Sequence, residues 1–301
     1  MKRKVDRVEI PHASSFTEGW CLVDIETEGR FWRTSKLMAV HVIEYGDPCT
    51  ELSLYAERES DEYDMLSELS QVLMRASNIM TFNGNSFDLP HLRKKYQAYR
   101  ASDPTNGRNS LDLMRALAPY QFLFGMQSHH LSDYLTLFSG RYEVRNDAEG
   151  AFLVSSLLDL RRIFTAAPSS LSACYETSPV SGKKMLTASW HMDDPLPVDI
   201  DLTDEVFHLF SREGVANLEI ETDGEMLRRY YTDYENYEFL LSEGYAAHRS
   251  LTSYVAADRK EKAVRENCFM PVPVASVFPD RPDRLCTYIK SALDYLRRNI
   301  P

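Results

Sequence analysis

The first residues whose types and spacing could do chemistry are two carboxylates, Asp24 and Glu26, at the end of the apolar segment 20–23 (WCLV). This segment predicts a strand, and successive strand side chains point to opposite faces, so the two carboxylates share one face while Ile25 points into a core. Neighbouring anions raise each other's pKa unless a cation lies between them. The pair therefore favours a divalent metal site. The triplet Asp-x-Glu is not specific alone, because it recurs at Asp147/Glu149, Asp223/Glu225 and Asp233/Glu235.

A third carboxylate, Asp88, lies in the segment 81–92 (TFNGNSFDLPHL). Asn83 and Gly84 allow a sharp turn after a short strand. We expect Phe87 to pack beneath the site and Pro90 to occupy the first turn of the following helix. Asp88 is then presented beside that turn, either as part of a site or only as a cap of its helix.

A fourth carboxylate, Asp159, lies in an apolar segment, 148–166, that predicts one helix ended by Pro168. A buried carboxylate is costly unless it is paired or bound to a metal. Asp159 is therefore either a metal ligand or the partner of Arg161 or Arg162. If the register of this third segment is assigned wrongly, Asp147 is the upstream acidic candidate that takes the place of Asp159.

These three segments, VDIET, FNGNSFDLP and the helix with Asp159, resemble in order and rough spacing the three motifs of the DEDD exonuclease superfamily. Between them, segments 112–120 and 123–125 resemble more narrowly the YprB-type ribonuclease H-like domain. The resemblance covers about residues 18–167. The second half resembles the C-terminal module that accompanies such domains in some bacterial proteins.

The resemblance implies that four carboxylates hold two Mg²⁺ or Mn²⁺ ions: Asp24, Glu26, Asp88 and Asp159. It also implies substrate contacts from Thr27, Asn83 and Phe87. Two such ions can hold the attacking water and the leaving oxygen of a phosphoryl displacement, and both ions prefer oxygen ligands. The implied function is that of a 3′–5′ exonuclease acting on single-stranded or frayed DNA or RNA.

Ser155 occupies the catalytic position four residues before Asp159, where the family usually has His or Tyr. A serine hydroxyl can hydrogen-bond a water but hardly accepts its proton near neutral pH. The alternative is therefore a weakened or inactive exonuclease-like module that binds nucleic acid or a protein partner.

The elements that must position these residues follow from hydrophobic periodicity. The first half predicts strands and helices in this order: strands 37–44 and 51–57, helix 61–75, strand 78–82, a helix from about 86 to 100, strand 109–113, and helical pieces 114–124 and 131–138. Antiparallel strands followed by strands that alternate with helices make a mixed sheet flanked by helices. This is the order of an α/β, ribonuclease H-like domain.

The Ser-, Thr- and Pro-rich segment 167–184 favours a domain boundary, which gives a ribonuclease H-like domain over 1–167 and a smaller α+β domain over 168–301. In the second domain we expect a hairpin over 218–231, a helix over 246–266 and a last helix from Asp283. A run of rings could stack bases or could instead be core: Tyr230, Tyr231, Tyr234, Tyr237 and Phe239.

The composition is that of a soluble protein, with 44% hydrophobic residues and a net charge of −11. This charge argues against tight non-specific duplex binding but not against catalysis on nucleic acid. Five scattered cysteines give no zinc or disulfide pattern, and neither a membrane span nor a secretory signal is evident. We therefore expect a cytoplasmic protein with no membrane partner, whose substrate is single-stranded nucleic acid.

Overall fold

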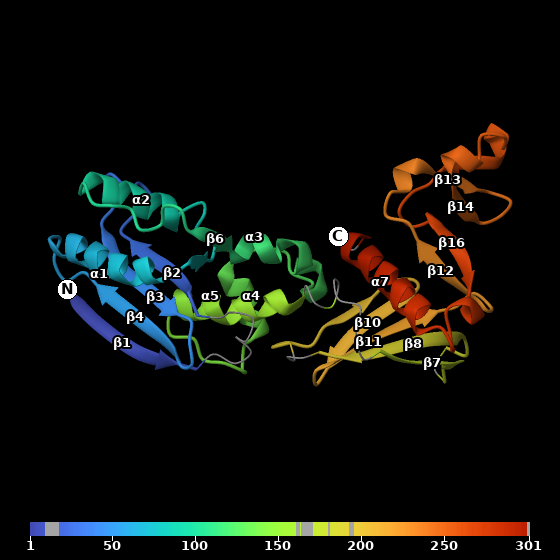
Figure 1. The fold of residues 1–301 in the computed structure, drawn as a ribbon, viewed down its shortest axis with the longest axis horizontal. Helices are drawn as coiled ribbons and strands as arrows, with labels where there is room; N and C mark the ends of the chain where they lie inside the picture. Colours follow the sequence, from blue (N-terminus) through green and yellow to red (C-terminus); the bar gives the residue numbers. More distant parts are fainter. Residues whose placement is uncertain (10–17, 161–162, 164–170, 180, 193–195, 300–301) are drawn as a thin grey trace. The chain divides into compact units, whose positions relative to one another are not determined.

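The structure is a computed structural model, and it describes residues 1–9, 18–160, 163, 171–179, 181–192 and 196–299 (Figure 1). The chain forms two compact units. The N-terminal unit comprises Met1–Gln121, Met126–Asp159 and Leu196–Val198, and the C-terminal unit comprises Phe122–Gly125, Leu160–Pro195 and Asp199–Pro301. The domain boundary expected between residues 167 and 168 lies outside the described residues.

A six-stranded sheet with the order β1-β4-β3-β2-β5-β6 forms the centre of the N-terminal unit. Its strands are β1 (Lys2–Val8), β2 (Trp20–Thr27), β3 (Leu37–Glu44), β4 (Cys49–Tyr55), β5 (Asn78–Thr81) and β6 (Asn109–Asp112). The neighbours β1/β4, β4/β3 and β3/β2 pair antiparallel, whereas β2/β5 and β5/β6 pair parallel. The carboxyl ends of β2, β5 and β6 therefore meet at one edge of the sheet.

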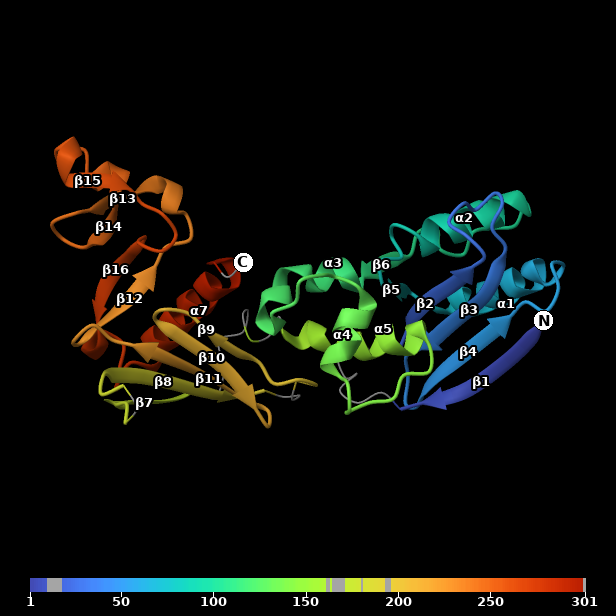
Figure 2. The same cartoon turned by 180° about the vertical axis from the view of Figure 1, so that it is seen from behind.

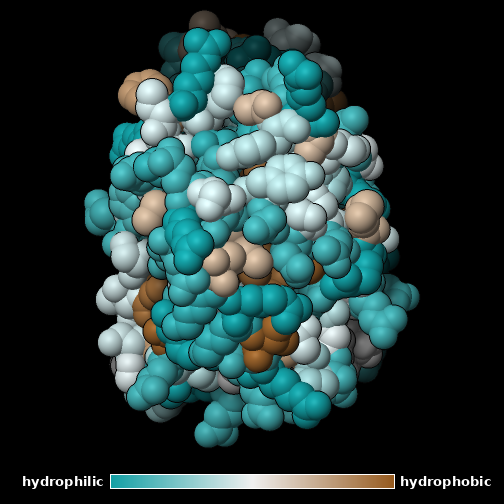
Figure 3. Space-filling view, turned by 90° about the vertical axis from the view of Figure 1, so that its left-hand side faces the viewer, coloured by the Kyte–Doolittle hydropathy of each residue, from teal (hydrophilic) through white to brown (hydrophobic). Residues whose placement is uncertain are grey.

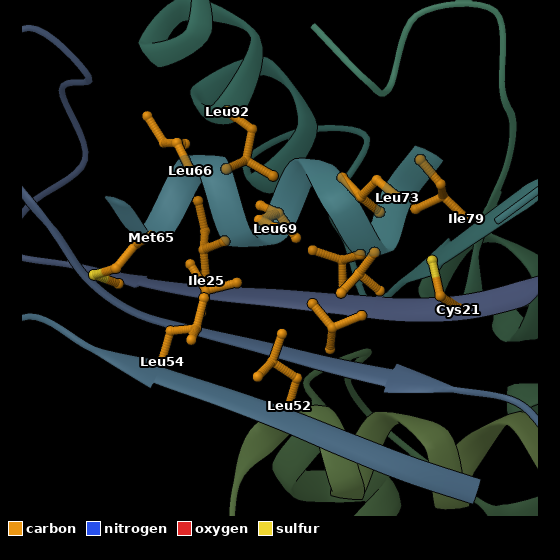
Figure 4. Packing of buried hydrophobic residues seen from close by; sticks show 14 of the residues in the cluster. Cys21, Ile25, Leu52, Leu54, Met65, Leu66, Leu69, Leu73, Ile79 and Leu92 are labelled. Atoms are coloured by element: carbon orange, nitrogen blue, oxygen red, sulfur yellow. The ribbon is translucent and has the colours of Figure 1, made fainter. Parts of the chain in front are cut away.

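The helices of this unit are α1 (Asp61–Arg75), α2 (Asp88–Ala98), α3 (Leu113–Leu117), α4 (Leu131–Leu137) and α5 (Asp147–Ser155). Acidic residues occupy the first turn of α1 and Arg75 the last, which suits the helix dipole. The buried side chains of α1 recur at helical spacing and pack on one face of the sheet. In Figure 4, Ile25 and Leu54 of the strands point toward Met65 and Leu69 of α1, and α2 contributes Leu92 to the same core. The predicted mixed sheet flanked by helices is confirmed.

The single helix predicted over 148–166 is wrong in one respect, because α5 ends at Ser155 and a 3₁₀ turn, η2 (Ser156–Asp159), follows. The hydroxyls of Ser155 and Ser156 donate to the carbonyls of Phe152 and Leu153, three residues back. Such local bonds compete with the regular helix pattern and tighten its last turn. Residues 161–162 and 164–166 lie outside the described part of the chain.

The C-terminal unit contains an antiparallel sheet with the order β7-β8-β11-β10-β9, a two-stranded sheet and a three-stranded sheet (Figure 2). The strands are β7 (Ser172–Thr177), β8 (Lys184–His191), β9 (Asp201–Thr203), β10 (Phe207–Arg212), β11 (Val215–Glu221), β12 (Met226–Tyr230), β13 (Tyr237–Leu240), β14 (Tyr245–His248), β15 (Lys260–Lys262) and β16 (Phe269–Pro273). The last helix, α7 (Pro282–Asn299), packs its Tyr295 ring against Tyr230 and Phe207. The expected α+β character is confirmed.

Two expectations for this unit are wrong. The segment 218–231 forms the expected turn, in which Asp223 and Met226 bridge, but its strands do not pair with each other, because β11 pairs with β8 and β10 whereas β12 pairs with β16. The helix expected over 246–266 is absent from these described residues, which form β14, β15 and short 3₁₀ turns. Here pairing with β13 and burial of Ala246 and Ala263 in a small core decide the local structure.

The aromatic run is largely core rather than an exposed stacking surface. Tyr230 is buried, and its ring stacks on Tyr295 with centroids 3.9 Å apart. Tyr231 stacks on Tyr237 at 4.5 Å, and both rings pack against the small core around Cys268. These rings therefore stabilise the C-terminal unit.

The outer surface is mostly hydrophilic with scattered apolar patches on the side shown in Figure 3. Among the described residues, the helices are too short or too polar to cross a bilayer. The five cysteines are free thiols.

Candidate functional site

The strand β2 positions Asp24 and Glu26 as the sequence predicts. Its residues alternate, so that Val23 and Ile25 enter the core below α1 while Asp24 and Glu26 lie on the opposite face. Asp24 is half-buried, and Glu26 is exposed with 58% of its side chain accessible. A register shift against β3 falls between Glu26 and Thr27, so the strand bends directly after the two carboxylates.

A tight turn after β5 positions Asp88. Asn83 adopts a φ of 61°, in the left-handed region that asparagine tolerates. A Cβ on Gly84 would lie only 2.4 Å from Cβ of Thr81, so only glycine fits there. The chain then enters α2, whose first residue is Asp88, and an Asp88 carboxylate oxygen accepts a hydrogen bond from the backbone amide of Ile25 at 3.0 Å.

Asp112, at the end of β6, holds this turn in place. Its two carboxylate oxygens accept hydrogen bonds from the backbone amides of Asn83 at 3.0 Å and Asn85 at 3.2 Å. Sequence reasoning did not assign a role to Asp112. Its position at the end of a short predicted strand, parallel to the one before it, is the signal that could have found it.

The electrostatics of Asp24 and Asp88 show that their negative charge is not compensated by the protein. Burial raises the pKa of Asp24 to about 6, and the charges of Asp147 and Glu26 add to this effect while His41 opposes it. Burial also raises the pKa of Asp88 to about 7, and the charge of Asp24 contributes in the same direction. Two carboxylates in this state favour a proton or a cation between them.

Asp147 is the acidic residue of α5 that lies close enough to act on Asp24 electrostatically. It is the first residue of α5, directly after the cap residue Asn146, whose side chain accepts a hydrogen bond from the amide of Glu149 at 2.8 Å. The helix contacts both β2 and β3. The structure therefore brings Asp147, the alternative candidate in the sequence, within electrostatic reach of Asp24.

Ser155 lies at the other end of α5, eight residues and so about 12 Å farther along the helix axis. Its side chain is fully buried, and its hydroxyl donates to the carbonyl of Phe152. The Phe152 ring stacks on Tyr45, whose amide donates to the carbonyl of Trp20, at the start of β2 rather than at its acidic end. The structure therefore does not bring Ser155 to Asp24. The backbone of Asp159 ends η2, and its side chain lies outside the described part of the structure.

The three residues expected to contact substrate have these positions. Thr27 ends β2, and its hydroxyl donates to the carbonyl of Gly29 at 2.7 Å. Asn83 forms the turn described above. Phe87 immediately precedes α2 and packs against the core beneath the turn, with its ring 5.7 Å from that of His91. Their roles toward a substrate stay predictions.

A buried polar network behind the carboxylates was missed by sequence reasoning. His41 pairs with Asp24 across β2 and β3, and its Nδ1 donates to the Ser53 hydroxyl at 3.0 Å. Ser53 in turn donates to Glu51 at 3.0 Å. The signal that could have found this network is a histidine in an apolar strand opposite Glu51 and Ser53, which share one face of the next strand.

Glu51 also fixes the start of α5. The Arg145 guanidinium donates to Glu51 at 3.0 Å, and the Asn146 side-chain amide donates to it as well. Burial opposes ionisation, but hydrogen bonds from His41, Asn146 and Ser53 hold the pKa of Glu51 below its ordinary value. For His41, burial is outweighed by the hydrogen bond and charge of Glu51, which raise the pKa of the imidazole. The Nε2 atom of His41 lies 3.6 Å from a Glu26 oxygen and has no hydrogen-bond partner among the described residues.

The donor set suits a hard divalent cation, since it consists of carboxylates whose raised pKa values show that His41 and the Ile25 amide only partly offset burial and mutual repulsion. In the described residues, however, no three His, Cys, Asp or Glu side chains are already close enough to hold one ion. A bound metal would therefore bring the carboxylates closer together, because they do not already form a complete coordination site.

The class that fold and site define is a ribonuclease H-like α/β domain with an acidic cluster at the carboxyl edge of its central strands. Residues 21–154 match the RNase_H_2 family model, which is described as RNase_H superfamily. The matched segment includes Asp24, Glu26, Asp88 and Asp147, and it ends before Ser155 and Asp159. No curated protein matches the sequence.

Similar solved structures include three of exonuclease I. The apo form has a TM-score of 0.39 and 10% identity, covering 93% of this chain and 70% of that chain. E. coli exonuclease I in complex with a 5cy-dT13 oligonucleotide has a TM-score of 0.39 and 11% identity, with coverage of 93% and 70%. A product-bound exonuclease I has a TM-score of 0.37 and 12% identity, with coverage of 93% and 71%.

Proposed function

We propose that this chain is a metal-dependent 3′–5′ exonuclease that hydrolyses single-stranded or frayed nucleic acid. The observation that carries the proposal is the half-buried Asp24 beside the buried Asp88 at the carboxyl edge of the sheet, where their pKa values are raised to about 6 and 7. A protein gains nothing in stability from such a pair. A cation bound between the two carboxylates would compensate their charges, and hydrolysis of a phosphodiester would use that cation.

Asp24, Glu26 and Asp88 are the proposed ligands, and we assign the fourth carboxylate to Asp147. Its charge acts on Asp24, and it lies within the segment that matches the family model. Asp159, which the motif spacing favours, is the alternative fourth ligand. Divalent ions bound here would supply Lewis-acid stabilisation of an in-line displacement at phosphorus.

Other residues of the chain would position the proposed metal ligands. The amide of Ile25 holds Asp88 toward β2, and the Asp112 carboxylate fixes the turn that delivers Asp88. On the other side, Glu51 holds both His41 beside Glu26 and the first turn of α5 beside Asp24. The family's usual His or Tyr has no counterpart at Ser155, so we expect slow turnover, because loss of a general base typically costs roughly 10²–10⁴ in rate.

We place the catalytic domain in residues 1–167, of the YprB-type subclass, and we propose that residues 168–301 form a separate α+β domain. The experiment that tests the catalytic proposal is incubation of the purified full chain with 3′- or 5′-labelled single-stranded DNA and RNA in Mn²⁺ or Mg²⁺. We expect shortening from the 3′ end, absent in chelator and in an Asp24→Asn/Asp88→Asn double variant. Equal degradation by wild type and double variant would instead favour a non-catalytic module that binds nucleic acid or a protein partner.

A further inference from the structure

The loop that joins β2 to β3, residues 28–36 (EGRFWRTSK), combines an exposed phenylalanine ring with positively charged side chains. It follows the end of β2 that carries Asp24 and Glu26, which is here called the acidic edge. We propose that this loop, here called the aromatic loop, is a binding site for single-stranded nucleic acid in which Phe31 stacks on an unpaired base. The proposal rests on the proposed function, because it names how the substrate of the same site is held.

The aromatic loop is an ordered turn rather than a loose connection. The carbonyl of Phe31 accepts hydrogen bonds from the amides of Thr34 at 3.0 Å and Ser35 at 2.8 Å. The base of the loop is closed by a hydrogen bond from the amide of Glu28 to the carbonyl of Lys36 at 3.0 Å. Because Phe31 is at the tip of a hydrogen-bonded turn, its ring is held out at low entropic cost to a ligand.

Phe31 is 79% exposed, so its ring has an open face in the described structure. A phenyl ring held in water gives up the stabilisation that its burial would bring, so a stacked base would recover it. The neighbouring Trp32 is half-buried, and the Arg33 guanidinium lies 5.3 Å from its ring centroid. Trp32 therefore anchors the loop and orients a cation beside Phe31.

The charge of the loop complements a phosphate backbone and contrasts with the rest of the chain. It carries Arg30 and Arg33, together with Lys36, which pairs with Glu59 at 3.4 Å, against a single carboxylate, Glu28, in a protein whose net charge is −11. Aromatic faces combined with backbone-tracking cations are the means by which proteins hold single strands without reading sequence.

The short separation between Phe31 and Glu26 along the chain keeps the Phe31 ring near the acidic edge. Phe31 follows Glu26 by five residues, so the two Cα atoms are at most about 18 Å apart. A base stacked on Phe31 would therefore belong to one of the few nucleotides nearest the 3′ end that occupies the acidic edge. This placement predicts a preference for ends whose bases are unpaired.

The test measures binding separately from cleavage. The full-length Asp24→Asn/Asp88→Asn variant is titrated into single-stranded DNA and RNA oligonucleotides that carry 2-aminopurine at one of the last four 3′ positions. We expect Phe31→Leu, which keeps an apolar side chain but removes the ring, to raise the dissociation constant by roughly 5- to 100-fold and to abolish the fluorescence change of the stacked base. Phe31→Trp should retain both signals. Tyr63→Leu, which removes a 52% exposed ring from α1 of the same unit, is the matched control and should change neither.

The outcomes separate this inference from the proposed function. If the active protein shortens oligonucleotides while Phe31→Leu leaves both the dissociation constant and KM unchanged, the inference is overturned and the nuclease proposal stands. If cleavage is absent but Phe31→Leu still weakens binding with loss of the fluorescence signal, the inference stands and the catalytic proposal fails. Absence of any oligonucleotide binding, or weakening of binding to a protein partner only, also overturns the inference.

Discussion

A carboxylate oxygen of Asp88 accepts a hydrogen bond from the backbone amide of Ile25 over 3.0 Å. This bond ties the first turn of α2 to the strand that carries Asp24 and Glu26, although the two residues are 63 positions apart in the chain. It leaves the negative charge of Asp88 facing Asp24 in a buried setting. The structure therefore holds the carboxylates together at a cost in stability.

Asp88→Asn should stabilise the metal-free protein at pH 7.5. The amide can still accept the hydrogen bond from Ile25, and it removes a buried charge whose pKa is raised to about 7. We expect a gain on the order of 2 kcal/mol, seen as a rise of several degrees in the Tm measured in chelator. Asp47→Asn, at an exposed position between β3 and β4, is the control. A lower Tm for Asp88→Asn would mean that the charge of Asp88 is compensated.

The stability of the metal-free protein should fall as the pH rises from about 5 to about 7.5. Asp24 and Asp88 have folded-state pKa values of about 6 and 7, above their ordinary value of 3.8, so the folded state binds more protons than the unfolded state in this window. Glu51, whose pKa is lowered, titrates below it. Thermal melts in chelator at several pH values check this, with the Asp24→Asn/Asp88→Asn variant as a control that should show a flatter profile.

Millimolar Mn²⁺ should reverse that trend, since the ion replaces protons at the same carboxylates and binds more tightly as they ionise. We expect the Mn²⁺-induced rise in Tm to grow between pH 5.5 and 7.5. An equal rise in wild type and in the double variant would place the bound ion elsewhere.

Asp147→Asn and Asp159→Asn should differ. If Asp147 is the fourth carboxylate, its change to Asn should lower the exonuclease rate by at least about 100-fold and reduce the Mn²⁺-induced rise in Tm, since even outer partners of metal ligands are worth 10- to 100-fold. Asp159→Asn should leave both within about twofold of wild type by this assignment. The reverse result would return the fourth position to Asp159, as the motif spacing favours.

Ser155→His should destabilise the protein rather than restore a general base. The serine side chain is fully buried and bonded within its own helix, so an imidazole there would overpack the core at a cost of about 1–3 kcal/mol. Urea denaturation of Ser155→His beside Ser155→Ala measures this cost. A faster and equally stable Ser155→His variant would show that this end of α5 does reach the site.

Glu51→Ala should be among the most destabilising single changes in the N-terminal unit. It would leave the buried His41–Ser53 pair and the Asn146 side chain without their acceptor, and each buried polar group left unsatisfied costs about 1–3 kcal/mol. Urea denaturation checks the stability. The Mn²⁺-induced rise in Tm of the surviving folded protein should also shrink, because the first turn of α5 loses its anchor.

The strands and helices of the first half were predictable from periodicity because their partners are local or follow a regular order. The helix over 61–75 and the strand over 37–44 match α1 and β3 in both ends. The second half was less predictable. The alternation in 215–221 and 226–230 shows two strands correctly, but their partners, β8 and β16, lie far away in the chain, and local pattern carries no information about them.

The candidate site shows the same limit. Asp24 and Asp88 could be found because each stands directly at the end of a predicted element. Ser155 and Asp159 were favoured by spacing within one long helix, and spacing cannot reveal which end of that helix meets the sheet. His41 and Glu51 escaped notice because their importance depends on a cross-strand face and on the distant Arg145.

The bond between Glu51 and Arg145 spans 94 residues, and this separation matters during synthesis of the chain. When β4 has left the ribosome, α5 has not yet been made, so Glu51 lacks its cation and Asp24 lacks Asp147 as a neighbour. We expect the nascent sheet to remain open on this face until about residue 155 has emerged, since α5 covers it. The candidate chemistry would thus be the last part of this unit to assemble, and a prematurely terminated chain could not carry it out.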